Sequence, residues 1–387
     1  MKIEFSKRLK NLPPYLFVEI DKAKREARKQ GRDLIDLGIG DPDLPTPGNI
    51  IEKLYQASKD SRNHKYALDQ GMPVLRQAIA DWYKRRFNVD LNPETQILPL
   101  IGSKEGIAHM PLAFVNRGEY VLSPNPSYPP YRGSAILSDG KVQDMPLLEK
   151  NNFLPDFKKI PLPARKKAKL MFLNYPNNPT GAIADAEFYR KAIDFASKYN
   201  IIIAHDAAYS EMSYDGYKPM SFLEVEGAKD TGVEFHSLSK TYNMTGWRIG
   251  WVCGNARVVS GIAKVKSNID SGIFSAIQIA GVEALSGPQE HIQKMRAIYQ
   301  ERRDVLCAGL KSIGWNFLKP EAAFYVWVSV PKGYDSRGFA ALLLEKCDIV
   351  VTPGVGFGKC GEGYIRFALT VSKERVQEAM ERIQKRV

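Results

Sequence analysis

Cysteine is scarce in this sequence, and its few copies show no metal-ligand pattern. The 387 residues include five histidines and four cysteines, which are Cys253, Cys307, Cys347 and Cys360. Neither set has the short spacing of a zinc site or the arrangement of a disulfide framework. We therefore expect no metal site and no structural disulfide.

Long hydrophobic runs are missing as well. Residues 1–10 alternate charged with apolar side chains, so they lack the apolar centre of a signal peptide. No later segment reaches the length of a membrane span, and no repeat or low-complexity tract is visible. These absences predict a folded cytoplasmic protein.

Charge of one sign is in excess, with a formal net charge of +12. The basic runs at 22–32 and 165–169 are dispersed and have no interleaved aromatic residues. Net charge affects solubility and non-specific binding more than fold. We interpret the excess as a solvated basic surface and expect no nucleic-acid partner.

The chain is long enough for a large core and for two domains. Between about residues 95 and 285, apolar strand-like runs such as 170–173 and 201–204 alternate with helical stretches such as 187–199. This alternation predicts an α/β fold with a mostly parallel sheet and helices on both faces. The last hundred residues differ, because strand patterns at 323–330 and 364–369 precede a closing amphipathic helix at 373–386.

Three parts follow from these patterns. We expect an N-terminal segment over 1–45 that packs with the small domain, a large domain over 46–287, and a small C-terminal α+β domain over 288–387.

Ligands of open parallel sheets bind beyond the carboxyl ends of the strands. The loops expected there carry polar side chains at 174–181, 205–209 and 237–248. In the third loop Lys240 is followed eight positions later by Arg248. Such a lysine alone is most often a surface residue, and an acid such as Asp206 is most often a cap or an ion-pair partner.

Together, Lys240 and Asp206 suit the chemistry of pyridoxal phosphate. A lysine amine forms a Schiff base with the aldehyde, and a carboxylate keeps the ring nitrogen protonated so that the ring accepts electrons. Asp206 follows an apolar run, so its buried charge would need a cationic partner, which a pyridinium supplies.

Other side chains suit the ring oxygen and the phosphate. Asn178 and Tyr209 can donate to the ring oxygen, although Asn178 before Pro179 also fits an ordinary turn. A phosphate needs a helix N-terminus, hydroxyls and a cation. These are offered by residues 102–106, Ser237, Ser239 and Arg248.

These ordered motifs resemble the class I and II aminotransferases, the fold type I pyridoxal phosphate enzymes. The resemblance extends from Leu37 to Arg366. It implies that Lys240 is the Schiff-base lysine and the acid/base of a ping-pong transamination between an amino acid and a 2-oxo acid. It also implies that Asp206 pairs with the ring nitrogen, and that Tyr209 and Asn178 contact the ring oxygen.

The resemblance assigns the remaining contacts. Arg366 would grip the substrate α-carboxylate, Tyr128 would stack on the ring, and Tyr66 would reach the phosphate of the neighbouring subunit in a homodimer. The phosphate site would consist of Ser103, Lys104, Ser237, Ser239 and Arg248.

Within the family the sequence is most similar to the LL-diaminopimelate aminotransferases of lysine biosynthesis, with 2-oxoglutarate as the acceptor. This similarity places Tyr15, Gly40 and Asp69 near the substrate, and Asp69 stands where plant-type members have a glutamate. Aspartate, alanine or aromatic aminotransferases remain alternatives. A carbon–sulfur lyase of the cystathionine β-lyase type would use the same Lys240 and Asp206.

Overall fold

A seven-stranded sheet forms the centre of the protein in the computed structural model, which describes residues 1–13 and 16–387 but not the side chains of residues 16–19. The strand order is β2-β8-β7-β6-β5-β3-β4. These strands are β2 (Ile97–Leu100), β3 (Tyr120–Asn125), β4 (Lys141–Pro146), β5 (Ala168–Asn174), β6 (Ile202–Asp206), β7 (Gly232–Ser237) and β8 (Gly250–Gly254).

Strand direction brings the polar loops to one edge of this sheet. Strands β4, β3, β5, β6 and β7 are parallel, whereas β8 is antiparallel to β7. Strand β2 is antiparallel to β8 and therefore runs in the same direction as β7. Consequently β2, β5, β6 and β7 all end at the same edge, where ligand sites of such sheets are found.

The side chains of strand β5 show that the sheet is buried on both faces. Its side chains Leu170 and Phe172 belong to one apolar core, and the alternate side chains Met171 and Leu173 belong to the other. Side chains of a strand alternate between faces, so a continuous apolar run needs cover on both sides. The mostly parallel α/β sheet predicted from the sequence is confirmed.

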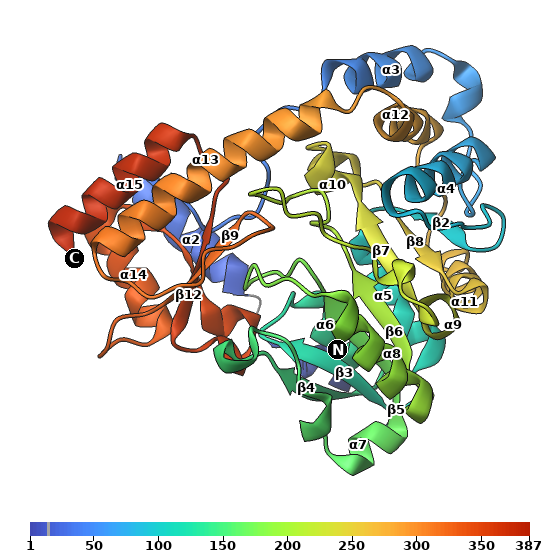
Figure 1. Cartoon of the computed structure of the whole chain (residues 1–387), viewed down its shortest axis with the longest axis horizontal. Helices are drawn as coiled ribbons and strands as arrows, with labels where there is room; N and C mark the ends of the chain where they lie inside the picture. Colours follow the sequence, from blue (N-terminus) through green and yellow to red (C-terminus); the bar gives the residue numbers. More distant parts are fainter. Residues whose placement is uncertain (14–15) are drawn as a thin grey trace.

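Helices supply that cover, as Figure 1 shows. Helix α5 contacts α6 and α11, and all three contact the sheet, while α12 packs on α3 and α4 beyond strand β2. The helices of this part are α3 (Gly48–Ser58), α4 (Pro73–Phe87), α5 (Ser103–Phe114), α6 (Pro130–Leu137), α7 (Leu162–Lys167), α8 (Ala186–Tyr199), α9 (Ala228–Thr231), α10 (Leu238–Thr241), α11 (Ala256–Lys266) and α12 (Ser275–Ser286).

The C-terminal part surrounds a second, smaller sheet. Its antiparallel strands have the order β11-β12-β9, with bounds Thr352–Pro353, Tyr364–Ala368 and Tyr325–Ser329. The long helix α13 (Glu290–Ser312) spans from the large part to the small one, where it packs on α15 (Lys373–Arg386) (Figure 1). Helix α14 (Ser336–Cys347) completes this layer. The strands and the closing helix expected here are confirmed.

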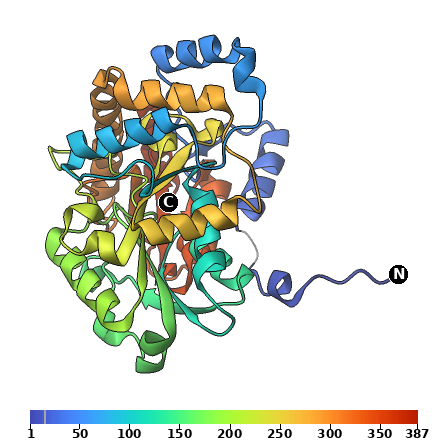
Figure 2. The same cartoon turned by 90° about the vertical axis from the view of Figure 1, so that its right-hand side faces the viewer.

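The N-terminal segment joins the small sheet region through β1 (Ile35–Asp36), which pairs in parallel with β10 (Ile349–Val350). Before it come α1 (Lys7–Lys10) and α2 (Leu16–Lys29). Figure 2 shows the first residues running away from the body of the protein. The division at residues 45 and 287 is retained as a proposal, and in the described part of the chain no helix is long and apolar enough to cross a membrane.

Candidate active site

A cavity of about 310 Å³ opens where β2, β5, β6 and β7 end. It contains most of the side chains singled out in the sequence. The predicted residues that line it are Gly40, Ser103, Lys104, Tyr128, Asn178, Asp206, Tyr209, Ser237, Ser239, Lys240, Arg248 and Arg366. The structure thus places residues from both ends of the chain around one space, although their individual roles stay predictions.

Lys240 lies on the short helix α10, immediately after strand β7. Its Nζ donates a 2.8 Å hydrogen bond to the carbonyl oxygen of Gly40. Burial lowers the pKa of Lys240 to about 8, and the charges of Arg366 and Arg248 act in the same direction, whereas Asp41 opposes them. An amine with this pKa is a stronger nucleophile near neutral pH than an ordinary lysine.

Asp206 ends strand β6 and is buried in the wall of the cavity. Its Oδ2 accepts a 2.7 Å hydrogen bond from the hydroxyl of Tyr131, and its Oδ1 accepts a longer one from the backbone of Ala208. Burial raises the pKa of Asp206, while the Tyr131 bond lowers it. Both donors are neutral, so the carboxylate still has an unmet preference for a cation in the cavity.

The start of helix α5 faces the guanidinium of Arg248. Gly102 caps this helix with φ +75°, and a Cβ at that position would lie 2.2 Å from Nη2 of Arg248. Ser103 and Lys104 form the first turn of α5, and Ser237 caps α10 by accepting from the backbone of Ser239. Backbone N–H groups, hydroxyls and cations converge here, which is the donor set of a phosphate site.

Arg366 lies on β12 and is held from two sides. Its Nη1 donates to Oδ1 of Asn178 at 2.8 Å, and its Nη2 donates to the carbonyl oxygen of Gly38 at 2.7 Å. The guanidinium also stacks on the rings of Tyr325 and Phe357, at 4.2 and 4.7 Å from their centroids. A fixed, planar guanidinium suits bidentate binding of a carboxylate.

Asn178 therefore has a partner that the sequence did not indicate. With Oδ1 bound to Arg366, its Nδ2 is the donor that can face a ring oxygen. Tyr209 bonds to the hydroxyl of Tyr325 at 2.9 Å, and burial raises the pKa of Tyr209 well above its usual value. Tyr209 is therefore a neutral phenol that can share a hydrogen bond.

Sequence reasoning missed Tyr131 and Tyr325, both of which line the cavity. Tyr131 lies three positions after Tyr128, close enough in the sequence for both side chains to line the same cavity. That spacing was the available signal. Tyr325 carried none, because a tyrosine in an apolar strand such as β9 is most simply a core residue.

Three predicted residues are not brought to the cavity of their own chain. Tyr66 is 95% exposed, and Asp69 is partly exposed on the same loop. Neither lines the cavity. Tyr15 lies outside the described residues.

The cavity fits a ligand with three different ends. A phosphate matches the start of α5 with Arg248, a cationic ring nitrogen matches Asp206, and an aldehyde matches Lys240. Tyr128 lines the same space and meets Tyr131 edge-on at 5.7 Å between ring centroids. The buried carboxylate of Asp206, which accepts hydrogen bonds from neutral donors, is the observation that most specifically indicates a cationic ring nitrogen.

The sequence is similar to one family of known proteins over nearly its whole length. Residues 32–383 match the family model described as aminotransferase class I and II. The chain is 53% identical to an LL-diaminopimelate aminotransferase of Moorella thermoacetica over 98% of this chain and 97% of the relative. It is 54% identical to one of Aquifex aeolicus over 98% of both chains.

A solved structure gives the same result. The substrate-bound structure of BacF from Bacillus subtilis superposes with a TM-score of 0.95 and is 42% identical in sequence. The match covers 100% of this chain and 98% of BacF. The similarity therefore includes both sheets and the cavity between them.

Proposed function

The chain belongs to the class I and II aminotransferase family and is an aminotransferase, and we propose that it transfers an amino group from LL-diaminopimelate to 2-oxoglutarate. The observation that supports this substrate is the sequence identity. It exceeds 50% over nearly the whole of both chains to LL-diaminopimelate aminotransferases of separate bacteria. The cavity between Lys240 and Arg366 has the donors that an amino acid and a 2-oxo acid require.

Pyridoxal phosphate is the cofactor that we propose for this cavity. When bound, it supplies an electron-accepting ring that stabilises negative charge developing at the substrate Cα. Lys240 would hold its aldehyde carbon, Asp206 its ring nitrogen, and Tyr209 with Asn178 its ring oxygen. The phosphate would be held by Ser103, Lys104, Ser237, Ser239 and Arg248, and the ring face by Tyr128.

Lys240 would also move the proton. Its pKa of about 8 leaves a usable fraction of unprotonated amine near neutral pH. The freed Nζ would take the proton from the substrate Cα and would then deliver it to carbon C4′ of the cofactor. The carbonyl oxygen of Gly40, 2.8 Å from Nζ, would hold the amine near this path.

Arg366 would orient the substrate, and Asp206 would orient the cofactor ring. Arg366 is fixed by Asn178 and Gly38, so a substrate α-carboxylate that binds it would be placed without reorganisation of the side chain. Asp206 would remain ionised opposite a ring cation, because that charge offsets the cost of burying the carboxylate. The Tyr131 hydrogen bond would fix which oxygen faces the ring.

We extend the proposal to a homodimer with shared active sites. The loop that carries Tyr66 and Asp69 is exposed, and apolar side chains nearby are exposed too. These side chains are Ile51, Tyr55, Leu68, Val74, Ile269 and Phe274. Apolar surface of this kind is typical of an interface. In the dimer, Tyr66 would reach the neighbour's phosphate and Asp69 the distal ammonium of the substrate.

A panel of amino donors tests the proposal. LL-Diaminopimelate, aspartate, alanine and an aromatic amino acid are each supplied with 2-oxoglutarate, and glutamate is measured. Fastest turnover with LL-diaminopimelate supports the proposed amino donor. Turnover with aspartate alone would contradict that donor and leave the aminotransferase activity in place. Pyruvate and ammonia released from cystathionine without an acceptor would instead indicate the lyase. The cytoplasmic location stays a prediction.

A further inference from the structure

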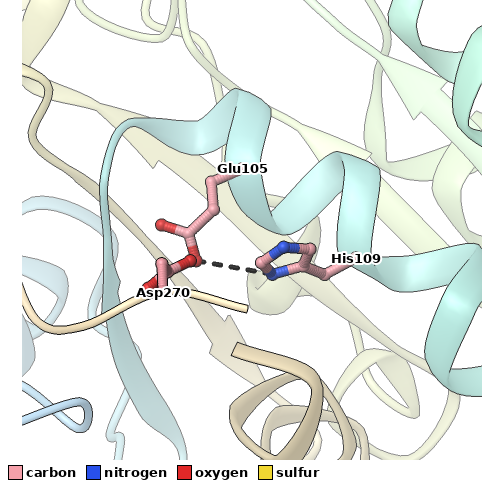
Figure 3. A group of neighbouring side chains, drawn as sticks. All are labelled: Glu105, His109 and Asp270. Atoms are coloured by element: carbon pink, nitrogen blue, oxygen red, sulfur yellow. Dashed lines mark ion pairs between the residues drawn. The ribbon is translucent and has the colours of Figure 1, made fainter. Parts of the chain in front are cut away.

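A buried ionic cluster adjoins the proposed phosphate site. It consists of Glu105, His109, Lys266 and Asp270, and is called the Lys266 cluster below. Figure 3 shows Glu105 and His109 on one helix, α5, with Asp270 facing them from another segment. The Lys266 side chain is 0% exposed, and its Nζ lies 3.1 and 3.2 Å from the two Glu105 oxygens and 2.5 Å from Asp270 Oδ1.

The cluster has the side chains of a metal site, but a lysine ammonium takes the place of the ion. One ligand atom each of Glu105, His109 and Asp270 lies within 4.8 Å of the others. However, the ammonium of Lys266 already occupies the space next to both carboxylates, where a cation would bind. Burial lowers the pKa of His109, so its ring is neutral and adds no second positive charge. The lysine itself is therefore the counter-ion.

On one side, the cluster reaches the turn that leads into α5. Glu105 accepts a 2.5 Å hydrogen bond from the backbone N–H of Ile101 through Oε2, the oxygen that also faces Lys266. Ile101 directly precedes Gly102 and Ser103, the residues that face Arg248 and the cavity. The position of Glu105 thus sets the position of the phosphate-binding turn.

On the other side, the cluster reaches the exposed loop at 66–72. Lys266 donates to Asp270 and to the carbonyl oxygen of Ser271. The next residue, Gly272, packs so closely that a Cβ there would lie 2.3 Å from the carbonyl oxygen of Leu68. The loop is therefore seated on the segment that Lys266 holds.

Gln278 fastens the end of the same loop. It is fully buried, accepts a 2.7 Å hydrogen bond from the backbone of Met72, and donates a 2.6 Å bond to the carbonyl oxygen of Ile273. Both ends of the contact between 66–72 and 270–273 are thus fixed. The loop has little freedom to move unless the segment after Lys266 moves with it.

We propose that Lys266 is a positioning residue that couples the phosphate-binding turn at 101–103 to the loop at 66–72. The inference rests on the proposed function, because that function places a phosphate at the turn and gives the loop its role at the neighbouring site. A phosphate that orders the turn fixes Glu105, and through Lys266 it also orders the segment that supports Tyr66 and Asp69. A buried ion pair often adds little net stability but does fix geometry.

Hydrogen exchange of the 66–72 amides tests this coupling. Pyridoxal phosphate is compared with pyridoxal, which lacks the phosphate, in a Y66F background that removes the hydroxyl proposed to reach the neighbour's phosphate. With Lys266 present, pyridoxal phosphate should slow exchange of 66–72 more than pyridoxal does. In K266M this difference should vanish, and the affinity for pyridoxal phosphate should fall about tenfold.

Two further variants separate coupling from loss of structure. D270A retains the bonds between Lys266 and Glu105 but removes the carboxylate that ties the 270–273 segment to Lys266, so it should keep the affinity for pyridoxal phosphate while weakening the phosphate-dependent protection of the loop. K24M is the matched control, because Lys24 is another buried lysine, paired with Asp36 in the N-terminal segment. K266R should restore part of the protection by restoring the charge.

The proposal is overturned if K266M keeps both the affinity and the phosphate-dependent protection. It is also overturned if K24M produces the same losses, since these would then reflect general destabilisation. Neither readout requires turnover, so they are separate from the substrate assignment. A chain that binds pyridoxal phosphate with the expected protection but fails to transaminate LL-diaminopimelate would contradict the proposed substrate alone.

Discussion

The hydroxyl of Tyr131 donates a 2.7 Å hydrogen bond to Oδ2 of Asp206, and both side chains are buried. The bond supports a carboxylate whose pKa is raised by burial, without neutralising its charge. A neutral donor leaves that charge available for a cation in the cavity, whereas an arginine in the same place would have consumed it. This relationship links helix α6 to the proposed ring site.

The Y131F variant tests that link. Loss of the hydrogen bond raises the pKa of Asp206 further, since the bond is the largest influence that lowers it. The acidic limb of the kcat/KM profile should therefore move to higher pH, and kcat/KM at its optimum should fall about 10- to 100-fold. Y175F, which removes another buried tyrosine hydroxyl bonded to Phe153, should leave the profile unchanged. Identical pH profiles for Y131F and wild type would refute the assigned role.

Lys240 should destabilise the cofactor-free protein. Its pKa falls from 10.5 to about 8 on folding, so the unfolded chain binds the proton more tightly between these two values. Stability therefore rises with pH from about 8 to 10.5, and the full cost, about 3 kcal/mol, is present below pH 8. K240M should unfold at higher urea concentration than wild type at pH 7, and the advantage should shrink by pH 10. An advantage of the same size at both pH values would contradict this account.

Arg366 should control substrate affinity through its geometry. In R366K the ammonium cannot reach Asn178, Gly38 and a substrate carboxylate as the planar guanidinium does. We expect kcat/KM to fall at least about tenfold, mostly through a higher KM for the amino acid. R76K alters a buried arginine outside the cavity, bound to Glu94, and serves as the control. An unchanged KM in R366K would show that the carboxylate binds elsewhere.

Asp69 should matter only for a substrate with a distal ammonium. If it faces that group from the neighbouring subunit, D69N should raise the KM for LL-diaminopimelate about tenfold or more and leave the KM for alanine unchanged. The comparison is made with both donors at saturating 2-oxoglutarate. Equal effects on the two donors would indicate a general effect of the loop on the site.

Much of the fold was predictable because strong local patterns agree with it. The apolar run at 170–173 could be assigned to a buried strand, and the amphipathic pattern at 373–386 became helix α15 without a change of bounds. The direction of β8 was not predictable, since an antiparallel strand has the same apolar pattern as a parallel one.

The candidate site was predictable where motifs were ordered along the chain, as for Asp206, Lys240 and Arg366. Contacts between distant elements were not. The bond from Tyr131 to Asp206 and the close packing of Gly40 against the Tyr325 hydroxyl depend on how separate helices, strands and loops meet in space. The Lys266 cluster was missed for the same reason, because Glu105 and Lys266 are 161 positions apart in the chain.

The central claim is that this aminotransferase uses Lys240 to move an amino group from LL-diaminopimelate to 2-oxoglutarate. The most direct measurement follows LL-diaminopimelate and glutamate together in one reaction with purified protein and pyridoxal phosphate, using wild type and K240M. The account predicts one glutamate for each LL-diaminopimelate consumed by wild type and none with K240M. Glutamate formed equally well by K240M, or no glutamate from LL-diaminopimelate with wild type, would contradict it.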